Sequence, residues 1–107
     1  MKTEVINLYH LKTAFVTNSN YVYIGRPSKW GNPYHIGKDG TREEVIEKYR
    51  KYILNNKKLM GSLIELKGKV LGCYCVEKSI DFIRDNKRCH GEILLEIIIK
   101  NADKVQQ

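Results

Sequence analysis

Both prolines of this chain fall in one stretch, Arg26–Tyr34, and this stretch limits the folds that the chain can adopt. Proline has a fixed φ and no backbone N–H to donate, so it is excluded from central strands and from helix interiors. An apolar segment, Tyr21–Ile24, comes just before the stretch, and a helical pattern starts after it at Thr41. We therefore predict an ordered loop at Arg26–Tyr34, placed between a strand and a helix.

Four short segments are predicted to be strands. Val5–Leu8 is apolar and partly alternating, which is typical of a strand. Ala14–Val16 and Tyr21–Ile24 flank the turn-forming tetrapeptide Thr17–Asn20, so this region is predicted to be a hairpin. Lys69–Cys75 is short and apolar and follows a glycine, which predicts a buried strand.

Three helices are predicted after the loop. Thr41 and Glu44 have the spacing of a capping box, and apolar residues recur at helical spacing after them. A shorter helix is predicted over Leu59–Leu66. The apolar run Ile93–Ile99 is predicted to be a core helix, with a final strand as the alternative, because Cys89–Glu92 before it is typical of a helix start.

This order of elements predicts a single α/β domain over residues 1–107, a compact Rossmann-like fold with a small sheet and flanking helices. Ligands in such folds bind at the carboxyl ends of strands and at helix N-termini. Arg26–Tyr34 follows one predicted strand, Cys73–Cys75 ends another, and Cys89–His90 opens a helix. We therefore expect the functional residues to lie in these segments.

Charge and cysteine content limit the partners and the compartment. Nineteen Lys and Arg residues against twelve Asp and Glu give a net charge of +7 at pH 7, which attracts nucleotides, phosphate esters or nucleic acid. The basic residues are scattered, however, which is also typical of a solvated surface. Three cysteines, with no export signal and no apolar run of membrane length, predict a cytoplasmic protein with reduced thiols and no membrane partner.

The loop offers the groups that a nucleotide ligand requires. Arg26 and Lys29 can contact a phosphate, and Trp30 and Tyr34 can offer flat faces to a base. Asn32 can hydrogen-bond a base edge or a ribose. The alternative is structural: both aromatic rings belong to the core, Asn32 makes a turn, and Arg26 pairs with a carboxylate of the following helix.

The cysteine and histidine residues allow three interpretations. Cys73, Cys75, Cys89 and His90 match the ligand count of a structural zinc site, although Cys-x-Cys is tighter than the usual spacing. In the catalytic interpretation, Cys89 at a helix N-terminus is a thiolate and His90 an acid or base. In the third, Cys73 and Cys75 are small buried hydrophobic residues.

Two further residues of this segment are site candidates. Glu92 is the nearest acidic residue to His90 and is therefore a candidate catalytic group. Its alternative role is to stabilise the first turn of the helix. Gly91 is a candidate ligand-binding residue because it belongs to the same helix start.

Several motifs carry a family resemblance. They are Val22–Arg26, Lys29–Tyr34, Gly40–Glu43, Leu66–Cys75 and Cys89–Gly91. In these motifs and their order the chain resembles the uncharacterised family catalogued as domain of unknown function 4326, found in small proteins of bacteria, archaea, phages and large DNA viruses. The resemblance names no reaction.

Two functions from different classes follow as expectations. The first is binding of a nucleotide or ADP-ribose-like phosphorylated small molecule, with either hydrolysis or transfer, or sequestration alone, as for a phage protein acting on nucleotide signals in the host cytoplasm. The second is a small basic nucleic-acid-binding module, with zinc as an optional stabilising ion and no other cofactor. A structural or partner-binding protein is the third alternative.

Overall fold

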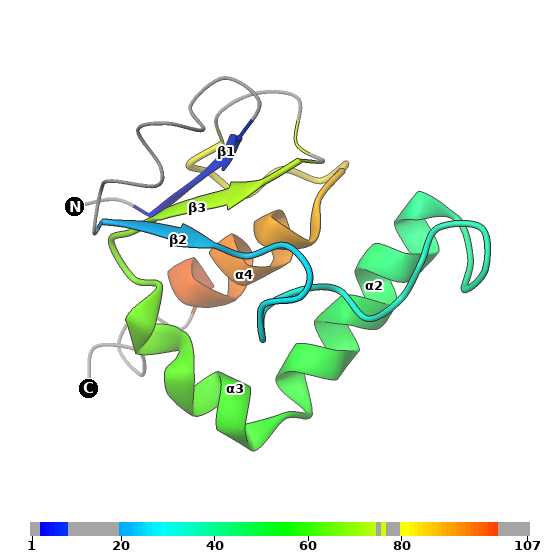
Figure 1. The fold of residues 1–107 in the computed structure, drawn as a ribbon, viewed down its shortest axis with the longest axis horizontal. Coiled ribbons are helices and arrows are strands. Elements are labelled where there is room, and N and C mark those ends of the chain that lie inside the picture. Colours follow the sequence, from blue (N-terminus) through cyan, green and yellow to red (C-terminus); the bar gives the residue numbers. More distant parts are fainter. Residues whose placement is uncertain (1–2, 9–19, 75, 77–79, 101–107) are drawn as a thin grey trace.

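The computed structural model describes residues 3–8, 20–74, 76 and 80–100. Within these residues, the strands β1 (Glu4–Asn7), β2 (Tyr21–Tyr23) and β3 (Val70–Cys73) form one parallel sheet in the order β1-β3-β2 (Figure 1). Because all three strands run in the same direction, their carboxyl ends meet at one edge of the sheet. That edge carries Asn7, Tyr23 and Cys73.

A helical crossover joins β2 to β3. It consists of α2 (Arg42–Leu54), α3 (Lys57–Ser62) and the 3-10 turn η1 (Leu63–Glu65). The predicted capping box is confirmed at the start of α2. The Glu44 backbone N–H donates to Thr41 Oγ1 at 3.2 Å, and the Thr41 N–H donates to Glu44 Oε1 at 2.8 Å. These bonds satisfy two amides that a helix start leaves unpaired.

The last helix, α4 (His90–Lys100), lies between the sheet and α2 (Figure 1). It packs on β1 and β3 on one side and on α2 on the other. Every residue from His90 to Ile98 is buried. This position explains why the sequence of α4 is apolar almost all round rather than on one stripe. The prediction of a core helix here is confirmed.

The core is continuous from the sheet through α4 to α2. Its largest fully buried side chains include Tyr49 and Ile53 of α2, Leu71 of β3 and Leu94 of α4. Removal of such side chains from water is the main favourable term in folding, at roughly 1.5–3 kcal/mol for each aliphatic residue. The core therefore holds α4 in a defined position relative to the strand ends.

The predicted α/β class and small sheet are confirmed. β2 pairs in parallel with β3 and stands at the edge of the described sheet, so this pairing does not test the hairpin that the sequence predicts. The other half of that hairpin, Ala14–Val16, and also Cys75 lie outside the described residues. Within the described ranges, no helix has the length and apolar character needed to cross a bilayer.

Candidate functional site

A hollow of about 390 Å³ opens at the carboxyl edge of the sheet, between the ends of β2 and β3 and the start of α4. We call it the strand-end cleft. Its lining residues come from these elements and from the loop after β2: Tyr23, Gly25, Arg26, Asn32, Cys73, Tyr74 and His90. Its size lies in the range of small-ligand sites, and its position is the one expected for a parallel α/β sheet.

A second, smaller hollow of about 90 Å³ adjoins the cleft. We call it the arginine pocket, because Arg26, Arg42 and Arg88 lie around it. Its other lining residues are Asn32, Tyr34, Ile36, Val45, Ile46 and His90. Arg26, Asn32 and His90 line both hollows, so the strand-end cleft and the arginine pocket form one site.

The charge of this site is positive. Among the described residues that line the two hollows, none is a carboxylate. Arg42 Nη1 donates to the Arg88 carbonyl oxygen at 2.9 Å, and this bond joins the start of α2 to the segment before α4. Arg26 Nη1 lies 2.6 Å from His35 Nδ1. Guanidinium groups in this arrangement suit a phosphate or carboxylate ligand.

The loop after β2 is held in place by its backbone and by Asn32. A Cβ atom on Gly31 would lie 3.1 Å from Arg26 Cα, so a larger residue here would require the loop to shift by a few tenths of an ångström. Asn32 Nδ2 donates to the Val45 carbonyl oxygen at 3.2 Å, and its Oδ1 accepts from the Tyr34 N–H at 2.9 Å. Asn32 thus ties the loop to α2 while also lining the site.

Two residues of this loop that were predicted to bind the ligand are placed elsewhere. Trp30 is only 2% exposed and belongs to the core cluster, so its ring is not an open platform. Its carbonyl oxygen accepts a hydrogen bond from Tyr49 Oη at 2.5 Å. Lys29 forms an ion pair with Glu65 at 2.9 Å and lines neither hollow of the site. Of the two cations predicted in the loop, Arg26 alone reaches the cleft.

His90 is the first residue of α4 and lines both hollows. Its Nε2 lies 2.6 Å from the Ile24 carbonyl oxygen. Because a carbonyl oxygen can only accept, the proton of the neutral ring is on Nε2 and Nδ1 keeps its lone pair. Burial lowers the pKa of His90 below its ordinary value of 6.5. His90 is therefore neutral near pH 7, and its accepting nitrogen Nδ1 lies 3.9 Å from Cys89 Sγ.

This protonation state can be measured. An ordinary histidine is about half protonated at pH 6.5; we expect the His90 ring to show the NMR shifts of a neutral imidazole at that pH. The unfolded chain binds the proton first as pH falls below 6.5. The free energy of unfolding should therefore decrease as the pH is lowered below 6.5, by up to about 1.4 kcal/mol per pH unit. His90→Gln should remove this contribution to the pH dependence of stability. A half-protonated His90 at pH 6.5 would contradict the assignment.

The two described cysteines meet behind the cleft. Cys73 Sγ lies 2.9 Å from Cys89 Sγ, and both thiols are buried in the core cluster. Cys73 lines the strand-end cleft, and Cys89 does not. Cys89 Sγ also lies 3.9 Å from His90 Nδ1. The structure thus brings Cys73, Cys89 and His90 together, while the thiolate and acid–base roles of Cys89 and His90 stay predictions.

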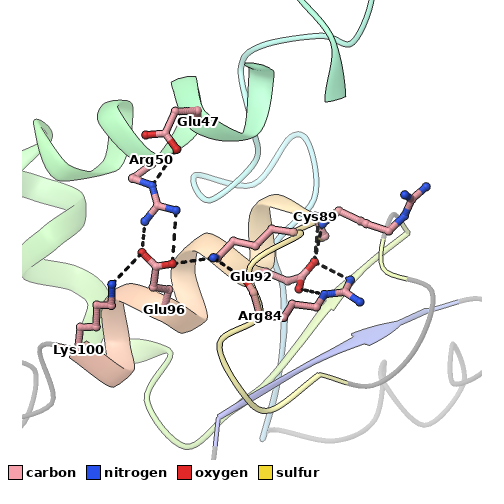
Figure 2. A network of polar contacts seen from close by, with 9 residues as sticks. Glu47, Arg50, Arg84, Cys89, Glu92, Glu96 and Lys100 are labelled. Carbon is pink, nitrogen blue, oxygen red and sulfur yellow. Dashed lines mark hydrogen bonds and ion pairs between the residues drawn. The ribbon is translucent and has the colours of Figure 1, made fainter. Parts of the chain in front are cut away.

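Glu92, predicted as a candidate catalytic residue, has a structural position (Figure 2). It is 2% exposed, and its carboxylate accepts from Arg84 Nε and, at 2.9 Å, from Arg84 Nη2. Its Oε2 also accepts from the backbone N–H groups of Arg88 at 2.8 Å and Cys89 at 3.2 Å. Glu92 lines neither hollow and instead caps the start of α4, the alternative role that the sequence allowed.

Backbone N–H groups at the start of α4 are hydrogen-bonded within the protein. The Gly91 N–H donates to Cys89 Sγ at 3.3 Å, so Cys89 and Glu92 act as the two partners of a capping-box arrangement. A Cβ on Gly91 would lie 2.7 Å from Ile24 Cδ1 and 2.9 Å from Val5 Cγ1. Gly91 therefore allows close packing of α4 on the sheet. The amides of Cys89 and Gly91 have partners within the protein, so neither is open to an anion.

One turn along α4, a second buried carboxylate stabilises the packing of α2 (Figure 2). Glu96 accepts from Arg50 Nη1 of α2, from Lys87 Nζ at 2.8 Å, and more distantly pairs with Lys100 at 3.8 Å. Burial lowers the pKa of Lys87. These ion pairs lie away from the strand-end cleft and explain why a helix buried on all sides carries two glutamates.

The zinc hypothesis rests on four residues, of which the structure describes three. Within the described part of the chain, no three His, Cys, Asp or Glu side chains form a group that could hold a metal ion. His90 uses Nε2 in its bond to Ile24. Cys75, the fourth candidate, lies outside the described residues. Zinc therefore stays a prediction for elemental analysis of the purified protein.

Four polar or charged side chains that line the site were not predicted from the sequence. Tyr23 and Tyr74 follow from strand position, since each lies at the carboxyl end of a parallel strand. Arg42 and Arg88 each lie at a helix start, one after the N-cap of α2 and one two residues before α4. A search for side chains at all strand ends and helix starts, rather than in motifs alone, would have found them.

The fold and the site define a small parallel α/β protein with a basic cleft at its strand ends. The chain belongs to the family described as Domain of unknown function (DUF4326), which matches residues 6–100. It is also similar to the protein named "Uncharacterized protein R718" of Acanthamoeba polyphaga mimivirus, with 35% identity over 103 residues that cover 87% of this chain and 77% of the viral protein. No solved structure matches it.

Proposed function

We propose that this protein binds a phosphorylated nucleoside, such as a nucleotide or an ADP-ribose-like molecule, in the strand-end cleft and the arginine pocket. One observation carries the proposal: the two hollows meet at Arg26, Asn32 and His90, and no carboxylate lines them among the described residues. Their place at the carboxyl ends of parallel strands also fits the Rossmann-like architecture that we propose for this small sheet.

Different groups of the site would contact the phosphate and the base of the ligand. Arg26, Arg42 and Arg88 are the anion contacts, because guanidinium groups bind phosphate oxygens in pairs. Tyr74 is 43% exposed at the end of β3 and lines the wider hollow, so it is the ring on which a base can stack. Tyr23 Oη donates to the Arg26 carbonyl oxygen at 2.7 Å and supports the loop.

Isothermal titration with AMP, ADP and ADP-ribose tests this proposal. We expect binding, and we expect Arg26→Ala to weaken it at least about tenfold, because a hydrogen bond to a charged group contributes roughly 1.5–3 kcal/mol. Lys67→Ala, which removes a cation outside the site, should leave the affinity unchanged. Chromatography of the same samples shows whether the ligand is returned intact, as in sequestration, or is cleaved. Absence of binding by all three ligands would rule out the proposal.

A further inference from the structure

A second pair of hollows lies along α2 and α3, outside the proposed nucleotide site. One, of about 510 Å³, runs beside the second half of α2, and the other, of about 290 Å³, lies beside α3. Tyr52 and Asn56 line both, so the two form one depression. We call it the α2–α3 groove. The residues that give it its character are Lys48, Lys51, Lys57 and Lys58 with Tyr34 and Tyr52.

Most of the positive charge of the groove is not neutralised by ion pairs with described residues; among its lining lysines Lys29 pairs with Glu65 at 2.9 Å. Among the described residues, no carboxylate lines either hollow. Lys51, Lys57 and Lys58 are exposed and form no ion pair with any described residue. Four of the scattered lysines, Lys48, Lys51, Lys57 and Lys58, therefore lie on this one surface. A polyanion that binds along this surface would gain from the release of its counterions.

Aromatic faces lie between these cations. Tyr34 and Tyr52 are half-buried and meet edge to face, with ring centroids 6.4 Å apart. Lys48 Nζ donates to the Asp39 carbonyl oxygen at 2.6 Å and lies 5.8 Å from the Tyr34 ring centroid. Single-stranded nucleic acid is bound by this combination of backbone-directed cations and rings on which bases stack, whereas a duplex keeps its bases stacked internally.

The groove continues into the nucleotide site. Tyr34 lines both the arginine pocket and the first hollow of the groove. The path therefore leads from the strand-end cleft, past Arg26 and Tyr34, to Tyr52 and the lysines of α3. Along all four hollows, the described lining residues include no Asp or Glu. A ligand longer than one nucleotide would meet only cationic, polar and apolar groups on this path.

We propose that the α2–α3 groove binds the phosphodiester backbone of a single-stranded nucleic acid, one nucleotide of which occupies the strand-end cleft. This inference rests on the proposed function and names its substrate class: a nucleotide unit carried on a strand. The lysines contact phosphates beyond the nucleotide in the cleft, and Tyr34 and Tyr52 stack its neighbours. The lysines of the groove and the proposed nucleotide site would then form one continuous binding surface.

The test compares a fluorescent oligothymidylate of about twelve nucleotides with a single nucleotide, ADP, at about 50 mM salt. We expect the oligonucleotide to bind at least about tenfold more tightly. Its binding constant should fall with salt by roughly 0.7 log units per phosphate contact for each tenfold rise in salt concentration. In the double variant Lys51→Glu/Lys57→Glu, we expect the affinity for the oligonucleotide to fall by a factor at least about ten times larger than the factor by which the affinity for ADP falls. Lys51→Gln/Lys57→Gln should show part of the loss.

The matched control is Lys67→Glu/Lys69→Glu, which makes the same change in net charge at the amino-terminal end of β3 and should change oligonucleotide affinity less than about threefold. Three results would overturn the inference: equal losses of oligonucleotide affinity in both double variants, oligonucleotide binding no tighter than ADP binding, or equally tight binding of an acidic peptide. In each case, ADP binding would still support the proposed function. Conversely, groove-dependent oligonucleotide binding without any ADP binding would support the groove and overturn the proposed function.

Discussion

Glu92→Ala is expected to lower the free energy of unfolding by about 3–5 kcal/mol, the loss typical of removing one partner from a buried ion pair. The carboxylate is 2% exposed and accepts from Arg84 and from the backbone N–H groups of Arg88 and Cys89. Its removal leaves these two amides without their acceptor at the start of α4. Denaturant titration measures the loss.

Two variants make this prediction specific. Glu92→Gln keeps an acceptor oxygen and most of the volume, so its loss should be smaller than that of Glu92→Ala. Glu43→Ala removes an exposed glutamate from the first turn of α2 and should cost less than about 1 kcal/mol. If Glu92→Ala were no more destabilising than Glu43→Ala, the buried network at the start of α4 would not be the stabilising element described above.

Trp30→Ala is expected to destabilise the fold by about 3–5 kcal/mol, because the side chain fills the core and its loss leaves a cavity. A stacking platform would behave differently: its removal would weaken ligand binding and leave stability almost unchanged. Because Trp30 is the only tryptophan, its fluorescence also reports its position. We expect a blue-shifted emission that a soluble quencher reaches poorly and that nucleotide addition leaves nearly constant.

Tyr74→Ala is the matched aromatic variant. Tyr74 is 43% exposed in the strand-end cleft, so its removal should cost less than about 1 kcal/mol of stability. Under the proposed function it should weaken nucleotide binding about tenfold, as expected for the loss of one stacked base. The opposite pattern, with Trp30→Ala stable but defective in binding and Tyr74→Ala normal, would restore the sequence-based interpretation of Trp30.

The local elements of this fold could be predicted because their signals are local. The capping box at Thr41 and Glu44, the apolar spacing of α2 and the glycine before β3 each depend on a few neighbouring residues. Backbone hydrogen bonding and side-chain spacing decide these elements without reference to the rest of the chain. For the same reason, the pairing of β2 was not predicted: strand partners come from distant segments, and β3 lies far along the chain.

The site divides in the same way. Sequence alone determined that a proline-rich loop and a cysteine–histidine helix start follow strand ends, and therefore that Arg26 and His90 could meet. Which side chains face the cleft depends on how the distant segments pack together. The Trp30 ring packs into the core because exposing a large apolar surface to water is costly. The Glu92 carboxylate turns toward Arg84 because burying an unpaired charge is costly. Those costs depend on neighbours that the order of residues does not reveal.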